Sequence, residues 1–126
     1  MVRLGSPRSL GEGLRLGTVR RPPRGVRKDE YARRNFYDAW VPELAPSARL
    51  VSRALSQPFT PPRWRAFARS YRSEMRAPLA RRLIELLAAL SHQTNFSVGC
   101  YCEDPSRCHR SLLKDLLIEA GAAVKE

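Results

Sequence analysis

Between Phe96 and Gly121, the spacing of the apolar residues changes from every second residue to the spacing of a helix. This change constrains the fold more than any other feature. Every second residue from Phe96 to Cys102 is apolar, which predicts a strand. A turn follows at 103–105, and leucines at helical spacing over 112–120 then predict a helix that ends at Gly121. A strand, a tight turn and a helix in succession indicate a layered α/β arrangement.

The rest of the chain carries the same two kinds of pattern. Residues 14–19 alternate in a way that predicts a strand ending at Val19. Helices are expected to begin after Ser47, after Thr60 and at Pro78, where a capping residue or a proline precedes apolar residues at helical spacing. Strands interleaved with helices predict a single α/β domain with a mainly parallel sheet flanked by helices.

The domain is expected to span residues 1–126, with residues 1–13 as a loose or looped lead-in that contains several glycines. Residues 1–4 add a short strand in this interpretation. Residues 36–41 are aromatic-rich and predict a further strand, for which a helical turn over 29–37 is the alternative.

The chain is strongly basic. Its formal net charge is +11, and residues 1–82 carry a net +13 whereas the remainder carries −2. With 43% hydrophobic residues, the chain has enough apolar surface to bury a core, so we expect a folded monomer. The longest uninterrupted apolar run, 86–90, is far shorter than a bilayer span, and no signal-peptide pattern begins at Met1. We therefore expect a soluble cytoplasmic protein with no membrane partner.

The Cys108-His109-Arg110 triplet stands at the predicted start of the last helix, just beyond a strand. Ligands bind at this place in open α/β sheets, and a helix N-terminus favours anions and thiolates. One hypothesis makes Cys108 a reactive thiolate, His109 its proton carrier or hydrogen-bond donor, and Arg110 an anion clamp. The distances along the chain from Cys102 to Arg107 and to Arg110 do not match a cysteine-phosphatase loop, so that chemistry is not the leading hypothesis.

Two other interpretations of this segment remain open. In the first, Cys100, Cys102, Cys108 and His109 bind a zinc ion. Cys100 and Cys102 on a regular strand lie roughly 6.6 Å apart, at ~3.3 Å per residue, which is too far for one ion unless the strand bends. In the second, the residues are structural: Cys100 packs as a small apolar side chain, while His109 and Arg110 make local contacts.

Arginines recur at helical spacing after Thr60, at Arg65, Arg69, Arg72 and Arg76. Such a stripe can follow a nucleic-acid backbone, so a non-catalytic nucleic-acid-binding module is the alternative function. A solvated helix face is the more common reason for a charge stripe, and the chain has no RNA-recognition, zinc-finger or helix-turn-helix signature. Aromatic residues of the same segment, Trp64, Phe67 and Tyr71, are expected in the core.

Three longer stretches resemble one family. Residues 97–113, from Ser-Val-Gly-Cys to Cys-His-Arg-Ser-Leu-Leu, resemble the strand, turn and Cys-His-Arg motif of the domain-of-unknown-function family 488. Residues 20–26 are similar to its Arg-x-x-Pro-Arg-Gly-Val, and residues 43–47 to its Glu-Leu-Ala-Pro-Ser. The resemblance covers about residues 2–122. Some members lack the triplet, which implies that the fold does not depend on it, and many carry a carboxylate at the position of Cys102.

The resemblance further implies that Arg20, Arg21 and Arg24 face Cys108 across a shared edge of the sheet. Basic side chains and a helix N-terminus then converge on one anion, a phosphate or a carboxylate. The leading prediction is a crevice that binds a phosphate-type anion or small molecule, in a thiol-dependent enzyme or a regulator without a cofactor. In the alternatives, the ligand is zinc or nucleic acid. The substrate and the reaction do not follow from the sequence.

Overall fold

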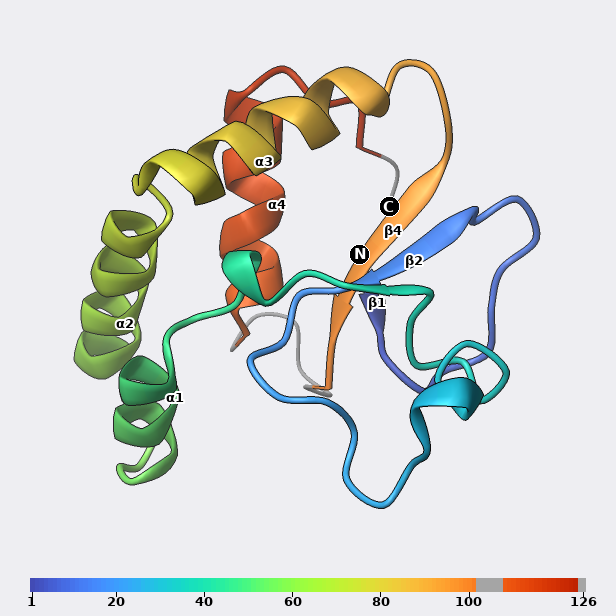
Figure 1. Ribbon diagram of the computed structural model, residues 1–126. Coiled ribbons are helices and arrows are strands. Elements are labelled where there is room, and N and C mark those ends of the chain that lie inside the picture. Colours follow the sequence, from blue (N-terminus) through green and yellow to red (C-terminus); the bar gives the residue numbers. More distant parts are fainter. Residues whose placement is uncertain (102–107, 125–126) are drawn as a thin grey trace.

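The computed structural model describes residues 1–101 and 108–124, and its strands form one parallel sheet (Figure 1). The strands are β1 (Val2–Arg3), β2 (Leu14–Gly17), β3 (Ala39–Trp40) and β4 (Phe96–Cys100). They lie in the order β1-β4-β2-β3, and each hydrogen-bonded pair is parallel. This confirms the predicted α/β class and the parallel sheet. The strand predicted over 96–102 ends at Cys100, and Cys102 lies outside the described residues.

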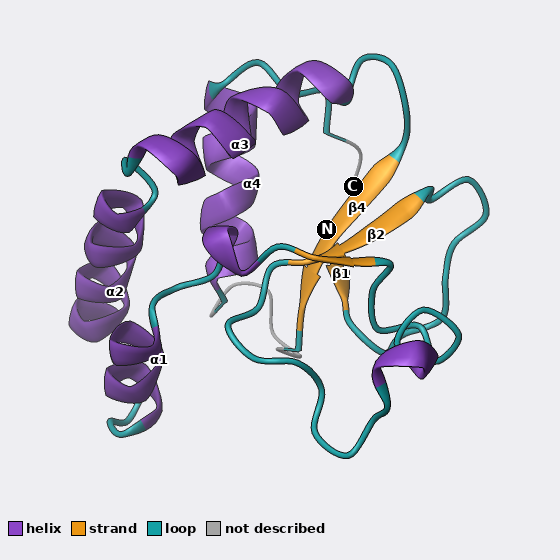
Figure 2. Cartoon of the chain, viewed as in Figure 1, coloured by secondary structure: helices purple, strands orange, loops and turns teal. Residues whose placement is uncertain are grey.

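The α-helices lie on one side of the sheet, as Figure 2 shows, and α4 stands between α2 and the sheet. Their bounds are α1 (Ala48–Leu55), α2 (Pro61–Glu74), α3 (Pro78–Leu90) and α4 (His109–Glu119). Two caps are as predicted, because the N–H of Leu50 donates to Ser47 Oγ and the N–H of Arg63 donates to Thr60 Oγ1, both at 3.2 Å.

The region before α1 contains both elements that were expected as alternatives, in shortened form. A 3-10 turn, η1 (Lys28–Glu30), replaces the longer helical turn, and β3 occupies only two residues at the edge of the sheet. A second 3-10 turn, η2 (Pro42–Leu44), follows and buries Leu44 completely. The pattern was ambiguous because neither element is long enough to show its period.

The main hydrophobic core lies between the helices and the sheet, around Tyr71, Leu113 and Val98. The leucines of α3 do not all face this core. Leu79 and Leu86 are 58% and 54% exposed, and the buried face of the helix is instead formed by Ala80, Ile84, Leu87 and Ala88. Leu79 and Leu86 lie on a different side of the helix from this face, because successive residues of a helix point about 100° apart.

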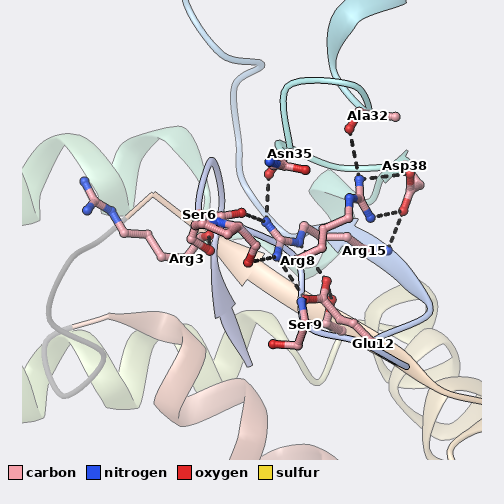
Figure 3. Close-up of polar contacts among 11 residues, drawn as sticks. Arg3, Ser6, Arg8, Ser9, Glu12, Arg15, Ala32, Asn35 and Asp38 are labelled. Carbon is pink, nitrogen blue, oxygen red and sulfur yellow. Dashed lines mark hydrogen bonds and ion pairs between the residues drawn. The ribbon is translucent and has the colours of Figure 1, made fainter.

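The lead-in before β2 is looped, as expected, but buried polar contacts fasten it to the sheet (Figure 3). Arg15 is fully buried, and its guanidinium donates to both carboxylate oxygens of Glu12 at 2.8 and 2.9 Å. The same guanidinium donates to the carbonyls of Ser6 and Asn35 at 2.8 and 2.7 Å. Ser97 Oγ, from β4, completes the cluster by donating to Glu12 at 2.7 Å.

Two carboxylates at this end of the sheet are held in their ionised form. The hydrogen bond from Arg15 is the main reason that the pKa of Glu12 falls to about 2. Arg8 binds both oxygens of Asp38 at 2.8 and 3.1 Å, and the pKa of Asp38 is lowered because hydrogen bonds and charges from Arg8 and Arg15 outweigh its burial. The cluster therefore fixes the beginning of β2, opposite the end that leads to the Cys108 region.

The carboxyl ends of β2 and β4 lie next to each other. Gly17 pairs with Gly99, so Thr18 and Cys100 each follow directly after a residue of the same pair. Both the N–H and the Oγ1 of Thr18 donate to the carbonyl of Gly99 at 3.0 Å. Gly17 is required in this strand because a Cβ there would lie 2.3 Å from the ring of Tyr37. The strand ends that position the candidate site are therefore closely packed.

Candidate functional site

Cys108 and His109 begin α4 at the carboxyl ends of β2 and β4. Cys108 is the N-cap residue of this helix, and its backbone is extended with φ −131° and ψ 148°. Cys108 Sγ lies 3.7 Å from Nδ1 of His109, and both residues are buried. The thiol therefore sits beside an imidazole and near the positive end of a helix dipole, two surroundings that favour a thiolate.

The other ring nitrogen of His109 is held by the backbone. His109 Nε2 lies 2.6 Å from the carbonyl oxygen of Thr18. A carbonyl can only accept, so Nε2 carries the proton and donates it. In the neutral ring, Nδ1 is then left as an acceptor that faces the thiol of Cys108. The thiol, the imidazole and the orienting carbonyl together have the geometry of an activated nucleophile.

Cys100 joins this pair from the end of β4. One ligand atom from each of Cys100, Cys108 and His109 lies within 4.8 Å of the others, and all three residues are buried. Cys100 and Cys108 also pack together in a small apolar cluster around Leu4 and Val19. The separation of Cys100 and Cys102 along a strand, the argument against zinc, does not apply to this set, because Cys108 comes from another element.

A pocket of about 960 Å³ opens above these residues. Cys100, Cys108 and His109 line it together with Arg20, Arg21 and Arg24. The basic loop after β2 and the triplet at α4 are thus brought to one cavity. The cavity volume lies within the ~300–1,000 Å³ typical of small-molecule sites.

Arg20 is the arginine whose position in the pocket is most firmly determined. Its Nε donates to the carbonyl of Pro46 at 3.0 Å and its Nη2 to the carbonyl of Ala45 at 3.3 Å. These contacts use two of the nitrogens of the guanidinium and fix its plane. Arg21 is exposed at its side chain, and its carbonyl accepts a hydrogen bond from Tyr101 at 3.1 Å.

Arg110 is buried but does not appear among the described residues that line the pocket. Successive residues of a helix point about 100° apart, so a His109 that faces the pocket turns Arg110 away from it. Burial lowers the pKa of the Met1 amino group, and the charges of Arg110 and Lys114 lower it further. Arg110 therefore lies toward the chain start and edge strand β1.

The predicted arginine stripe, which runs along α2 and ends at Arg76 just beyond that helix, faces away from the pocket. Arg65, Arg69 and Arg76 are exposed. Arg72 instead forms an ion pair with Glu119 of α4 at 2.8 Å, which joins the two helices. None of the four lines the pocket in the described part of the chain. Nucleic-acid contact through this stripe stays a prediction.

The aromatic residues assigned to the core in the sequence analysis partly form the pocket wall. Trp64 and Phe67 line the cavity together with Phe59, and Tyr71 continues the row into the core, where its ring centroid lies 5.6 Å from that of His109. Burial raises the pKa of Tyr71, whose hydroxyl donates to the carbonyl of Leu44 at 2.8 Å. The spacing of Trp64, Phe67 and Tyr71 shows that they share a helix face but does not show that a cavity lies beside it.

Two further arginines of the pocket, Arg53 and Arg63, were missed as candidate residues. Arg53 comes from α1, and Arg63 comes from the first turn of α2, where its Nη1 donates to the carbonyl of Pro58 at 3.1 Å. Neither belongs to a motif, so only the packing of α1 against α2 reveals them. Within residues 1–101 and 108–124, no helix has both the length and the apolar character needed to cross a membrane.

Comparison with known proteins gives one match. A search of the curated proteins and a search of the solved structures each found no significant match. The family model DUF488-N3a, described as the active DUF488-N3 subclade, matches residues 1–121. The match covers both strands that lead into the pocket and the Cys-His-Arg triplet, and it agrees with the resemblance seen in the sequence. The chain therefore belongs to the DUF488-N3a family.

Proposed function

We propose that the pocket binds a phosphate-type anion and that Cys108 is a thiol nucleophile toward the bound molecule. The observation that carries this proposal is the contact of Cys108 Sγ with His109 Nδ1 at 3.7 Å, in a ring oriented by the Thr18 carbonyl at 2.6 Å. A nucleophile, a base and a group that orients the base are the components of cysteine catalysis. The description of the family as an active subclade agrees with an enzymatic role.

The chemistry proceeds in two proton transfers. The Cys108 thiol gives its proton to Nδ1 of His109, and the thiolate forms a bond from Sγ to an electrophilic atom of the bound molecule. The bond from that atom to its leaving group breaks, with the electron pair going to the leaving group, which takes the proton from Nδ1. The Thr18 carbonyl stabilises the imidazolium between these steps because Nε2–H donates to it.

The arginines support the anionic part of the proposal. Arg20 and Arg24 line the same pocket as Cys108, and Arg20 is held in place by the carbonyls of Ala45 and Pro46. Guanidinium groups bind phosphate through paired N–H donors, and their charge also favours the thiolate. These arginines would bind the anion near the nucleophile.

The test compares two alkylating agents of similar size, anionic iodoacetate and neutral iodoacetamide. For each thiol, the rate with iodoacetate is divided by the rate with iodoacetamide. We expect this ratio to be higher for Cys108 than for a free-thiol standard. Inorganic phosphate should slow the reaction, and Arg24→Ala should abolish the preference for the anion. Arg27→Ala, in the same loop but outside the pocket lining, is the matched control. Mass mapping of the labelled peptide assigns the thiol. Reactivity equal to that of the standard, without protection by phosphate, would overturn the proposal.

A metal centre is the second candidate, favoured by the clustering of Cys100, Cys108 and His109 within 4.8 Å. A histidine that donates one ring N–H to a carbonyl and turns the other nitrogen to its neighbours is typical of metal ligands. Two thiolates and one imidazole leave a fourth position of zinc open to the pocket. Metal analysis of protein purified without added zinc tests this candidate. A stoichiometric metal whose removal by a chelator exposes Cys108 to alkylation supports the metal centre, and metal-free protein excludes it.

A further inference from the structure

We propose that the anion bound in this pocket is a nucleotide, a phosphate that carries a nucleobase. This inference rests on the proposed function, because it uses the same cavity and names the class of ligand. It depends on two properties of the pocket that a site for inorganic phosphate alone does not need, an aromatic wall and a size far above that of a single anion.

The aromatic wall comes from α2 and the residues just before it. Phe59, Trp64 and Phe67 all line the cavity. The rings of Trp64 and Phe67 are nearly parallel, with their centroids 5.4 Å apart, and Phe59 lies 6.5 Å from Trp64 at a tilt of 40°. Phe59 is still 47% exposed, so a planar ring placed against it would bury apolar area. Nucleobases are planar, and any of the bases can stack on such side chains.

The charged residues in the described lining of the pocket have one sign. Arg20, Arg21, Arg24, Arg53 and Arg63 line the pocket, and its described lining contains no aspartate or glutamate. Five arginines around one cavity favour an anionic ligand. A neutral nucleoside would leave this charge without a partner, and a sugar phosphate would leave the aromatic wall without one. A nucleotide satisfies both.

The two ends of the pocket suggest how the nucleotide lies. Arg20 follows the carboxyl end of β2, two residues after the carbonyl that orients His109, so the phosphate end belongs beside Cys108. Phe59 and Trp64 lie at the start of α2, and the rings of Phe67 and Tyr71 separate them from His109. A base stacked at Phe59 is therefore held away from the thiol, and the phosphate or the sugar faces it.

The primary test is a set of binding titrations on the wild-type protein by calorimetry. The probes are adenosine 5′-monophosphate, adenosine, ribose 5-phosphate and inorganic phosphate. We expect the nucleotide to bind at least about tenfold more tightly than ribose 5-phosphate, since stacking of one base accounts for that factor or more. Equal affinity for ribose 5-phosphate would overturn the role of the wall, and equal affinity for adenosine would overturn the role of the arginines.

Fluorescence provides a second reading of the same binding. The chain has two tryptophans, and Trp40 lies outside the described pocket lining, where its Nε1 donates to the carbonyl of Val19 at 2.7 Å. In Trp40→Phe, Trp64 is the remaining tryptophan, so quenching by the nucleotide but not by ribose 5-phosphate places the base at the wall. Phe59→Ala should weaken nucleotide binding about tenfold and leave phosphate binding unchanged. Leu10→Ala, at an exposed apolar residue outside the pocket, is the control and should change neither.

Further outcomes separate the possible sources of the ligand, and they separate this inference from the proposed function. If a single-stranded oligonucleotide binds and its binding depends on Phe59 and Arg24, the ligand is the end of a nucleic-acid chain and not a free nucleotide. If its binding depends instead on Arg65 and Arg69, the assignment of the ligand to the pocket is overturned. If no nucleotide binds while Cys108 is still protected by phosphate, the nucleotide inference fails and the proposed function stands. If the nucleotide binds and Cys108 is no more reactive than a free thiol, the catalytic proposal fails and the nucleotide site stands.

Discussion

Nε2 of His109 lies 2.6 Å from the carbonyl oxygen of Thr18, a residue 91 positions earlier in the chain. The contact joins the first turn of α4 to the end of β2. Because the acceptor belongs to the backbone, the orientation of the imidazole depends on the register of the sheet and not on the Thr18 side chain. The Oγ1 of Thr18 lies farther from the same nitrogen, at 3.5 Å.

The first prediction concerns this pair. His109→Asn replaces the basic nitrogen that faces Cys108 with an amide that cannot take the thiol proton. We expect the alkylation rate of Cys108 at neutral pH to fall at least about tenfold, toward that of a thiol without a base. Thr18→Val removes the hydroxyl and keeps the carbonyl. The carbonyl of Gly99 still accepts from the Thr18 N–H, so this control should cost about 1 kcal/mol of stability and leave the rate unchanged.

An unchanged rate in His109→Asn, with circular dichroism showing that the variant is folded, would contradict the role given to His109. A large fall in Thr18→Val would show that the side chain, and not the carbonyl, orients the ring.

The second prediction concerns the pH dependence of stability through Glu12. The pKa of Glu12 is lowered from 4.5 to about 2 in the folded protein. Ionised Glu12 therefore stabilises the fold fully above pH 4.5, and this contribution is lost as the pH falls toward 2. In Glu12→Gln the guanidinium of Arg15 keeps its burial but loses its charge partner, which we expect to lower the free energy of unfolding by about 3 kcal/mol at neutral pH.

Urea unfolding at several pH values measures this difference. The wild type should approach the stability of the variant as the pH falls from 4.5 to 2, since both then lack the charge at position 12. Asp29→Asn is the control, because Asp29 and Arg27 are 66% and 79% exposed and their ion pair should contribute less than about 1 kcal/mol. A constant difference between wild type and Glu12→Gln at every pH would contradict the assignment.

Local signals in the sequence were sufficient for the elements but not for the contacts between them. The caps at Ser47 and Thr60 and the start of α3 at Pro78 were predicted because each depends on residues within one turn. Arg15 was missed as a core residue, although it is fully buried, because its partners reach it through the folding of the lead-in. A charged residue within an alternating strand gives no sign of such partners.

For the candidate site, too, some residues could be found from the sequence and others could not. Cys108 and His109 were identified because a triplet at a helix start is visible in the sequence, and the family resemblance brought Arg20 and Arg24 to the same place. The Thr18 carbonyl could not be found, since a backbone group has no signature in the sequence and the contact spans 91 residues. Arg110 does not line the pocket among the described residues, and its role as an anion clamp stays a prediction.

The third prediction concerns the helix that forms one wall of the pocket. Ser47 caps α1, and its Oγ and N–H also donate to the two carboxylate oxygens of Glu74 on α2, at 2.5 and 2.8 Å. Ser47→Ala therefore loses a cap and a link between helices, at a cost of about 1–2 kcal/mol. Hydrogen exchange over residues 48–55 should become faster. Thr60→Ala, which removes a cap without a second partner, should leave exchange over 48–55 unchanged, and faster exchange there in both variants would contradict this account.

The last prediction separates two causes that usually act together at glycines. Gly11 and Gly13 both have φ of +78°, so an alanine at either position adopts a left-handed backbone at a cost of about 1–2 kcal/mol. A Cβ at Gly11 meets nothing within 4 Å, whereas a Cβ at Gly13 would lie 1.9 Å from the carbonyl oxygen of Asn95, just before β4. Gly13→Ala should therefore lose a further ~1–3 kcal/mol or more, because the lead-in must move away from the sheet. Urea unfolding of both variants measures the difference, which isolates the close approach from the backbone strain. Equal losses would show that the lead-in does not pack against Asn95 in solution.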